Sequence, residues 1–173
     1  MTLLSPEEEK RYTELQAMAL DLARSGETNI LEQMIKSVLS VDLADDKGNT
    51  LLMLATYNGQ LDTTRMLLRL GAKVDQRNDR GQTPLGGVAF KGYLEICKEL
   101  VKAGAQIDAD NGGGKTPIMF ATLFGRVEVV AYFKALDITY TQEKIFGFSV
   151  EKIAFLSSYI KQKFTTIKQK FFL

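Results

Sequence analysis

The chain has 173 residues, of which 45% are hydrophobic and 25% are charged, and its formal net charge is +1. This balance does not favour nucleic-acid binding, and the sequence contains no apolar run of about 18 residues that would predict a transmembrane helix. The chain has no histidine and one cysteine, Cys97, so we expect no metal centre, no cofactor, no intrachain disulfide and no Ser-His or Cys-His nucleophile pair.

The N-terminus carries the signature of a helix start. Ser5 and Glu8 have the spacing of a capping box, in which each side chain accepts a hydrogen bond from the other residue's backbone, and Pro6 suits the first helical position. Met1-Thr-Leu-Leu leads directly into this segment, so we expect no signal peptide and residence in the cytoplasm. We assign residues 1–44 to an N-terminal cap with a degenerate unit.

From the cap onward the chain repeats itself with a period of about 33 residues. Two sets of glycines keep this interval, namely Gly48, Gly81, Gly114 and Gly147, and Gly26, Gly59, Gly92 and Gly125. A fixed period of this length indicates one supersecondary unit restated along the chain, and so short a unit buries its apolar face only against a stacked neighbour. We therefore predict a single domain, an all-α solenoid of about five units with degenerate caps at both ends. The full units are expected at residues 45–77, 78–110 and 111–143, and the C-terminal cap at residues 144–173.

Each unit is expected to run from a turn through two helices. The first glycine suits a tight turn with positive φ, and a threonine two residues later can cap the first helix, as at Thr50, Thr83 and Thr116. The second glycine ends that helix, and an apolar pattern with a 3.6-residue period follows it. Cys97 lies in such a second helix, so we expect a buried thiol rather than a reactive one.

Residues 81–85, Gly-Gln-Thr-Pro-Leu, and 114–118, Gly-Lys-Thr-Pro-Ile, carry a specific motif of the repeat. On these residues the chain resembles the ankyrin-repeat family, in a register that covers roughly residues 12–173. The segments that begin at Asn49 and Asn78 are also similar to a group of small bacterial ankyrin proteins, some of which are linked with catalase and oxidative-stress defence. The resemblance implies a non-catalytic module that binds a protein partner, and the bacterial group implies a stress-related accessory role.

One departure from the family motif concerns its histidine, which is replaced by Met53, Gly86 and Met119. Gly86 is followed by Gly87 inside the first helix of a full unit, and each glycine costs about 1 kcal/mol relative to alanine there. We expect that helix either to be the least rigid of the stack or to admit a close neighbour at its glycines.

In ankyrin stacks, the turn tips and the exposed positions of the first helices line a concave surface that recognises partners. The resemblance places the tips of this surface at Asp46, Lys47, Asn49, Asp79, Arg80, Gln82, Gly112, Gly113 and Lys115. It places the helix positions, which lie beside the second glycine of each unit, at Tyr57, Asn58, Phe90, Lys91, Leu123 and Phe124. Tyr57, Phe90 and Leu123 are expected to form an apolar row with a polar rim, as in protein interfaces. The alternative is that these side chains pack on each other between units and leave little exposed area.

Two further segments have competing interpretations. The run Asn111-Gly-Gly-Gly-Lys-Thr is similar to a phosphate-binding loop, but Ala109 stands where that motif requires a glycine and the repeat places a turn here, so we interpret it as turn chemistry. Residues 159–173 predict a last helix whose lysines flank an apolar stripe, formed by Ile160, Phe164, Ile167 and Phe171. We interpret this helix as a cap, and the alternative is a peripheral membrane adaptor anchored by the basic, Phe-rich helix.

Overall fold

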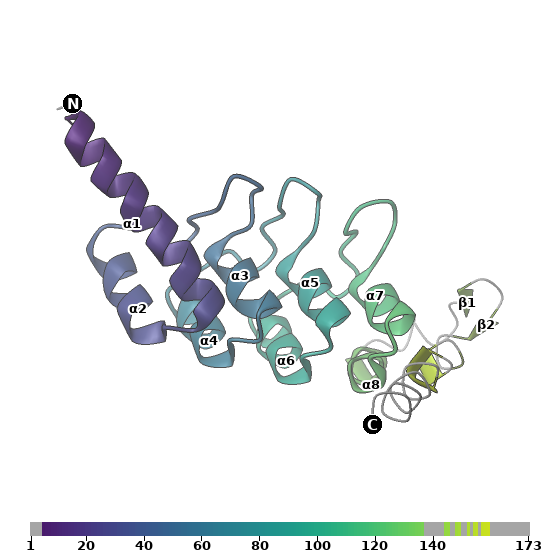
Figure 1. Ribbon diagram of the computed structural model, residues 1–173. Coiled ribbons are helices and arrows are strands. Elements are labelled where there is room, and N and C mark those ends of the chain that lie inside the picture. The colour runs from purple at the N-terminus through teal and green to yellow at the C-terminus, as the bar shows by residue number, and fades with distance from the viewer. Residues whose placement is uncertain are drawn as a thin grey trace, which may run out of the picture.

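The computed structural model describes residues 5–136 and, beyond them, residues 144–145, 148–149, 152, 154–155 and 157–159. These residues form a stack of helix pairs, and the loops that lead into the second, third and fourth pairs project from the same side of the stack (Figure 1). The pairs are α1 (Pro6–Ser25) with α2 (Thr28–Ser37), α3 (Leu51–Tyr57) with α4 (Leu61–Arg69), α5 (Pro84–Lys91) with α6 (Leu94–Lys102), and α7 (Pro117–Leu123) with α8 (Val127–Leu136).

The helices lie in two layers. The first helices contact one another in the order α1, α3, α5 and α7, and the second helices do so in the order α2, α4, α6 and α8. Each first helix also contacts the second helix of its own pair. The predicted all-α solenoid is therefore confirmed. A short hairpin follows, in which β1 (Lys144–Ile145) pairs antiparallel with β2 (Phe148–Ser149).

At three helices, the residue before the first turn caps the helix as the sequence predicts. The Ser5 side chain accepts a hydrogen bond from the backbone of Glu8 at the start of α1, and the Glu8 side chain accepts one from the backbone of Ser5, which completes the predicted capping box. Thr50 Oγ1 accepts from Met53 N at 3.2 Å, and Thr83 Oγ1 accepts from Gly86 N at 3.1 Å. Thr116 differs, because its buried hydroxyl has no hydrogen-bond partner among the described residues.

Two of the regularly spaced glycines occupy positions where the backbone conformation favours glycine. Gly81 has a φ of 74° in the loop before α5, and Gly92 has a φ of 87° where α5 ends. Residues that carry a side chain rarely adopt this left-handed backbone conformation, so glycine is favoured at both positions. The predicted fourth turn glycine, Gly147, lies outside the described residues.

The core repeats with the same period as the glycines. Ala55, Val88 and Ala121 are fully buried on the first helices, and Ala154, one period later, is 2% exposed. The second helices contribute a matching row that is also buried, formed by Leu67, Leu100 and Phe133. Each fully buried large apolar side chain stabilises the fold by about 1.5–3 kcal/mol, and here it does so across the interface between units.

Cys97 belongs to this core. Its side chain is fully buried in α6, as predicted, and burial raises the pKa of its thiol to about 12. The thiol is therefore protonated at neutral pH and is a poor nucleophile.

Among the described helices, none combines the length and the apolar character that a membrane crossing requires. The stripe predicted for the last helix, with its flanking lysines, lies outside the described residues, of which Tyr159 is the last.

Candidate functional site

A groove of about 560 Å³ lies between the loop tips and the first helices α3, α5 and α7. It brings together a polar wall from the loops and an apolar wall from the helices. The predicted site residues that line it are Lys47, Asn49, Tyr57, Asp79, Arg80, Gln82, Phe90 and Phe124. The lining also contains residues that the sequence did not indicate for the site, namely Met53, Leu54, Asn78, Thr83, Pro84, Gly86, Gly87 and Phe120.

Two loops form the polar wall, and one residue at the base of each loop holds its shape. Asp45 Oδ1 accepts hydrogen bonds from the backbone nitrogens of Lys47 at 3.0 Å and Asn49 at 2.9 Å. In the next loop, Asn78 Oδ1 accepts from the backbone nitrogens of Arg80 at 3.1 Å and Gln82 at 3.0 Å. Short side chains that accept from nearby backbone in this way fix the shape of a turn.

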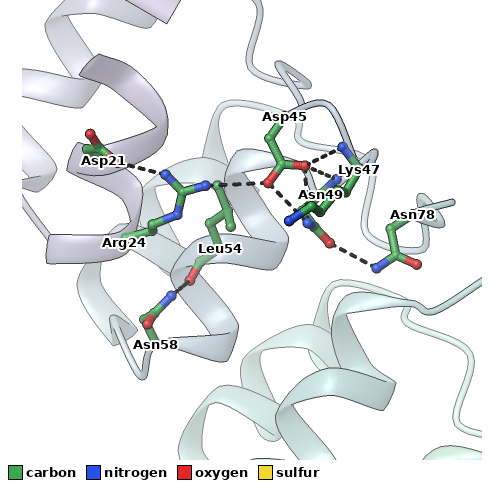
Figure 2. Close-up of polar contacts among 8 residues, drawn as sticks. All are labelled: Asp21, Arg24, Asp45, Lys47, Asn49, Leu54, Asn58 and Asn78. Atoms are coloured by element: carbon green, nitrogen blue, oxygen red, sulfur yellow. Dashed lines mark hydrogen bonds and ion pairs between the residues drawn. The ribbon is translucent and has the colours of Figure 1, made fainter. Parts of the chain in front are cut away.

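The two loops are also joined to each other and to α1. Asn78 Nδ2 donates to Asn49 Oδ1 at 2.9 Å, and Arg24 on α1 pairs with Asp45 at 3.4 Å and with Asp21 at 2.7 Å, as Figure 2 shows. Burial acts to raise the pKa of Asp45, but the hydrogen bonds from Asn49 and Lys47 and the nearby Arg24 guanidinium together hold it below its usual value. The polar wall is therefore ordered by contacts within the chain.

The apolar wall is a row of three rings. The rings of Tyr57 and Phe90 are nearly parallel, with an interplanar angle of 3° and centroids 6.3 Å apart. The rings of Phe90 and Phe124 form a T-shaped pair, with an interplanar angle of 71° and centroids 4.3 Å apart. The ammonium group of Lys91 lies 4.7 Å from the centre of the Tyr57 ring, within the range of a cation–π contact.

This row differs from the predicted one in its third member. Phe124, at the C-cap of α7, turns its ring toward Phe90 and lines the groove, whereas Leu123 does not line it. The two interpretations of the row both describe part of what is present. The rings contact one another between units, yet Tyr57 keeps 45% and Phe124 keeps 37% of its surface exposed.

The remaining predicted residues do not belong to the lining of the groove. Asn58 Nδ2 donates to Leu54 O at 2.8 Å and so completes the end of α3 (Figure 2), and Lys115 Nζ donates to Gly112 O at 3.2 Å within its own loop. Asp46 is exposed at its loop tip, and Lys91 contacts the face of the Tyr57 ring, which lines the groove.

Asn111 makes a contact that the sequence pattern did not indicate. Its Oδ1 accepts hydrogen bonds from Thr83 N at 2.7 Å and Thr83 Oγ1 at 3.0 Å, and its Nδ2 donates to Ala109 O at 2.8 Å. A Cβ on Gly86 would overlap the Asn111 side chain. Gly86 therefore admits a close neighbour, which was one of the two expectations for the glycine pair.

The glycine-rich run after Asn111 closes a turn, as interpreted from the repeat, with Asn111 N donating to Lys115 O at 2.8 Å. In the part of the chain that the structure describes, no group of three or more histidine, cysteine or acidic residues could hold a metal ion.

Comparison with known proteins identifies the stack. The family model for ankyrin repeats (3 copies) matches residues 3–78 and 70–143. A Pseudomonas aeruginosa protein named as an ankyrin repeat protein is 43% identical over 61 residues, which are 35% of this chain and 36% of that protein. The chain thus matches little more than a third of this curated relative. Ankyrin repeats are generally modules for protein–protein interaction, and the family is typically non-enzymatic. Because the family model covers most of the chain, the chain belongs to the ankyrin-repeat family.

Proposed function

We propose that this chain is a non-catalytic protein-binding module that holds a protein partner in the groove between the loop tips and α3, α5 and α7. The observation that carries the proposal is the row formed by Tyr57, Phe90 and Phe124, which lines the groove and stays partly exposed. Large aromatic side chains supply much of the binding energy of protein interfaces, above all when a polar rim surrounds them.

The order of the polar wall supports the same function. Asp45 and Asn78 hold their loop tips in shape, and the Asn78 to Asn49 hydrogen bond joins the two tips. A partner that binds to such a wall immobilises few additional groups, so less of the contact energy is lost to ordering.

Affinity capture from a lysate of the source organism tests the proposal. The wild-type chain is compared with a Phe90→Ser variant, which removes the central ring of the row, and with a Phe155→Ser variant. Phe155 is a matched control because it is 71% exposed and does not line the groove. We expect the captured protein to be lost with Phe90→Ser and retained with Phe155→Ser, while both variants keep the wild-type circular dichroism spectrum. Equal capture by all three chains would contradict a role of the groove.

Other expectations drawn from the sequence stay predictions. These are the residence in the cytoplasm, the accessory role linked with catalase, and the unit boundaries at residues 45, 78 and 111.

The alternative of a peripheral membrane adaptor rests on residues 159–173, most of which lie outside the described residues. Flotation with liposomes tests it, because a chain that is anchored by this segment moves with the lipid.

A further inference from the structure

The middle of the groove lacks a side chain that both neighbouring units possess. Gly87 on α5 stands one repeat after Leu54 on α3 and one repeat before Phe120 on α7. All three residues line the groove, so the large side chains of Leu54 and Phe120 flank a position that is bare helix backbone. We call this bare position, with the Tyr57 and Phe90 rings beside it, the notch.

The notch is open toward the groove, and the neighbouring glycine is not. Gly86 is buried, and the Asn111 side chain occupies the place of its missing Cβ. Gly87 is half-buried, and a Cβ there would have one neighbour within 4 Å, Tyr57 Cδ2 at 3.5 Å, among the atoms that the structure describes outside its own helix. A glycine inside a helix weakens that helix. The contact with Asn111 explains why position 86 requires a glycine. No contact with a described residue explains the glycine at position 87 in the same way.

The walls of the notch suit one large apolar side chain. The Tyr57 and Phe90 rings lie nearly parallel along the groove, and Phe124 closes the row in a T-shaped contact with Phe90. Rings offer faces and edges on which another aromatic or a branched aliphatic side chain packs. A side chain of this size at the notch would occupy the place that Leu54 and Phe120 fill in their own units.

The rim of the groove is basic. Lys47 and Arg80 belong to its lining, and Lys91 lies over the Tyr57 ring. No ion pair with a described residue is found for these three cations. Two carboxylates lie near them: Asp79 belongs to the lining and packs against the loop at Gly48, and Asp46 is exposed at the same loop tip as Lys47. The three cations outnumber these two carboxylates, and an excess of positive charge favours a partner that carries negative charge.

We propose that the groove takes a segment of a protein partner that carries one large apolar side chain beside an acidic residue. The apolar side chain fills the notch over Gly87, and the carboxylate lies toward the loop tips, where Lys47 and Arg80 line the groove. This inference rests on the proposed protein-binding function and adds to it the chemistry of the partner.

Selection from phage-displayed random dodecapeptides tests the inference on the full chain. The wild-type chain is expected to enrich peptides in which Phe, Leu or Trp stands within a few positions of Asp or Glu. A Gly87→Phe variant carries in the notch the residue that Phe120 provides one unit later, and it is expected to enrich none of these peptides. Gly87→Ala is the matched control, because its Cβ makes an ordinary contact with Tyr57 and leaves most of the notch open.

Folding and binding can be separated in this design. Phe and Ala both favour a helix more than Gly does, so the melting temperatures of the two Gly87 variants are expected to equal or exceed that of the wild type. Arg80→Glu is a second test at an exposed loop position. It should weaken an enriched peptide by about fivefold at low ionic strength and by less at high ionic strength. In the peptide itself, replacement of the apolar residue by Ala should weaken binding by about 30-fold.

Three outcomes would overturn the inference: enriched peptides without the apolar and acidic pair, equal binding by wild type and Gly87→Phe, or no enrichment at all. The capture experiment and the Gly87→Phe variant together distinguish failure of this inference from failure of the proposed function. If capture of the native partner still depends on Phe90 while Gly87→Phe binds normally, the groove binds a protein without use of the notch. If capture does not depend on Phe90 either, the proposed function fails as well.

Discussion

The side chain of Asn111 reaches back to Thr83 in the preceding unit and accepts hydrogen bonds from its backbone nitrogen at 2.7 Å and its hydroxyl at 3.0 Å. This pair ties the loop before α7 to the first turn of α5, beside the groove. Both residues are buried, so the groups that they satisfy have no access to water if the pair is broken.

Asn111→Ala is expected to lower the free energy of unfolding by about 2–3 kcal/mol, because it leaves the Thr83 amide and hydroxyl without acceptors. Urea unfolding followed by circular dichroism measures the change. Asn29→Ala serves as control, since Asn29 is exposed on α2 and should cost less than about 0.5 kcal/mol. Equal losses for the two variants would show that the Asn111 to Thr83 bonds are not a source of stability.

Gly86→Ala and Gly87→Ala are expected to change stability in opposite directions. At Gly87 the added methyl group fits against Tyr57, so the gain in helix propensity should raise the free energy of unfolding by about 0.5–1 kcal/mol. At Gly86 the methyl group overlaps Asn111, so the same gain should be outweighed by the displaced contact. Thermal unfolding of both variants checks the prediction, and shifts of the same sign would refute it.

Thr83→Val and Thr116→Val make a second matched pair. Thr83 Oγ1 accepts from Gly86 N and donates to Asn111, so its loss should cost about 1–3 kcal/mol. Thr116 Oγ1 is buried without a hydrogen-bond partner among the described residues, so a valine there should be neutral or stabilising. A comparable loss at Thr116 in urea unfolding would indicate that its hydroxyl is satisfied in solution.

The stabilising role of Asp45 should depend on pH. Its pKa is lower in the folded chain than the ordinary 3.8, so the contribution of its charge is fully present above the unfolded value and is lost as the pH falls through the folded value. Asp45→Asn should therefore be less stable than wild type at pH 7, and the gap should narrow at about pH 3. Urea unfolding at the two pH values measures it. A gap that stays constant would show that the charge of Asp45 contributes nothing.

The Cys97 thiol should be unreactive while the chain is folded. Burial raises its pKa to about 12, so both access and thiolate are lacking at pH 7.5. Ellman's reagent should label the chain only after urea is added. Rapid labelling of the folded chain would mean that α6 opens easily.

The fixed period of the sequence made the stack and its caps predictable, because Gly81, Gly92, Thr50 and Thr83 act through the backbone, which repeats with the sequence. Side-chain direction was less predictable. Asn78 and Asn111 share a register position and a residue type, yet Asn78 Oδ1 accepts hydrogen bonds from its own loop, whereas Asn111 Oδ1 accepts them from Thr83 in the preceding unit.

The sequence predicts both Leu123 and Phe124 as site residues but assigns the third place in the row to Leu123, and the difference has a similar reason. Leu123 occupies the register position of Tyr57 and Phe90, but Phe124 follows it at the C-cap of α7 and turns into the groove. The sequence predicts a helix that is weakened at Gly87, whereas the place of this residue in the groove depends on the side chains of the neighbouring units. The repeat pattern fixes where a residue stands, and packing decides where its side chain points.

Photo-crosslinking in the native lysate tests most directly whether a partner occupies the groove. One chain carries benzoylphenylalanine in place of Tyr57, and a second carries it in place of Asp62, which lies on α4 with its side chain 87% exposed and does not line the groove. We expect a discrete protein adduct from position 57 and none from position 62. An adduct from position 62 without one from position 57 would contradict binding in the groove.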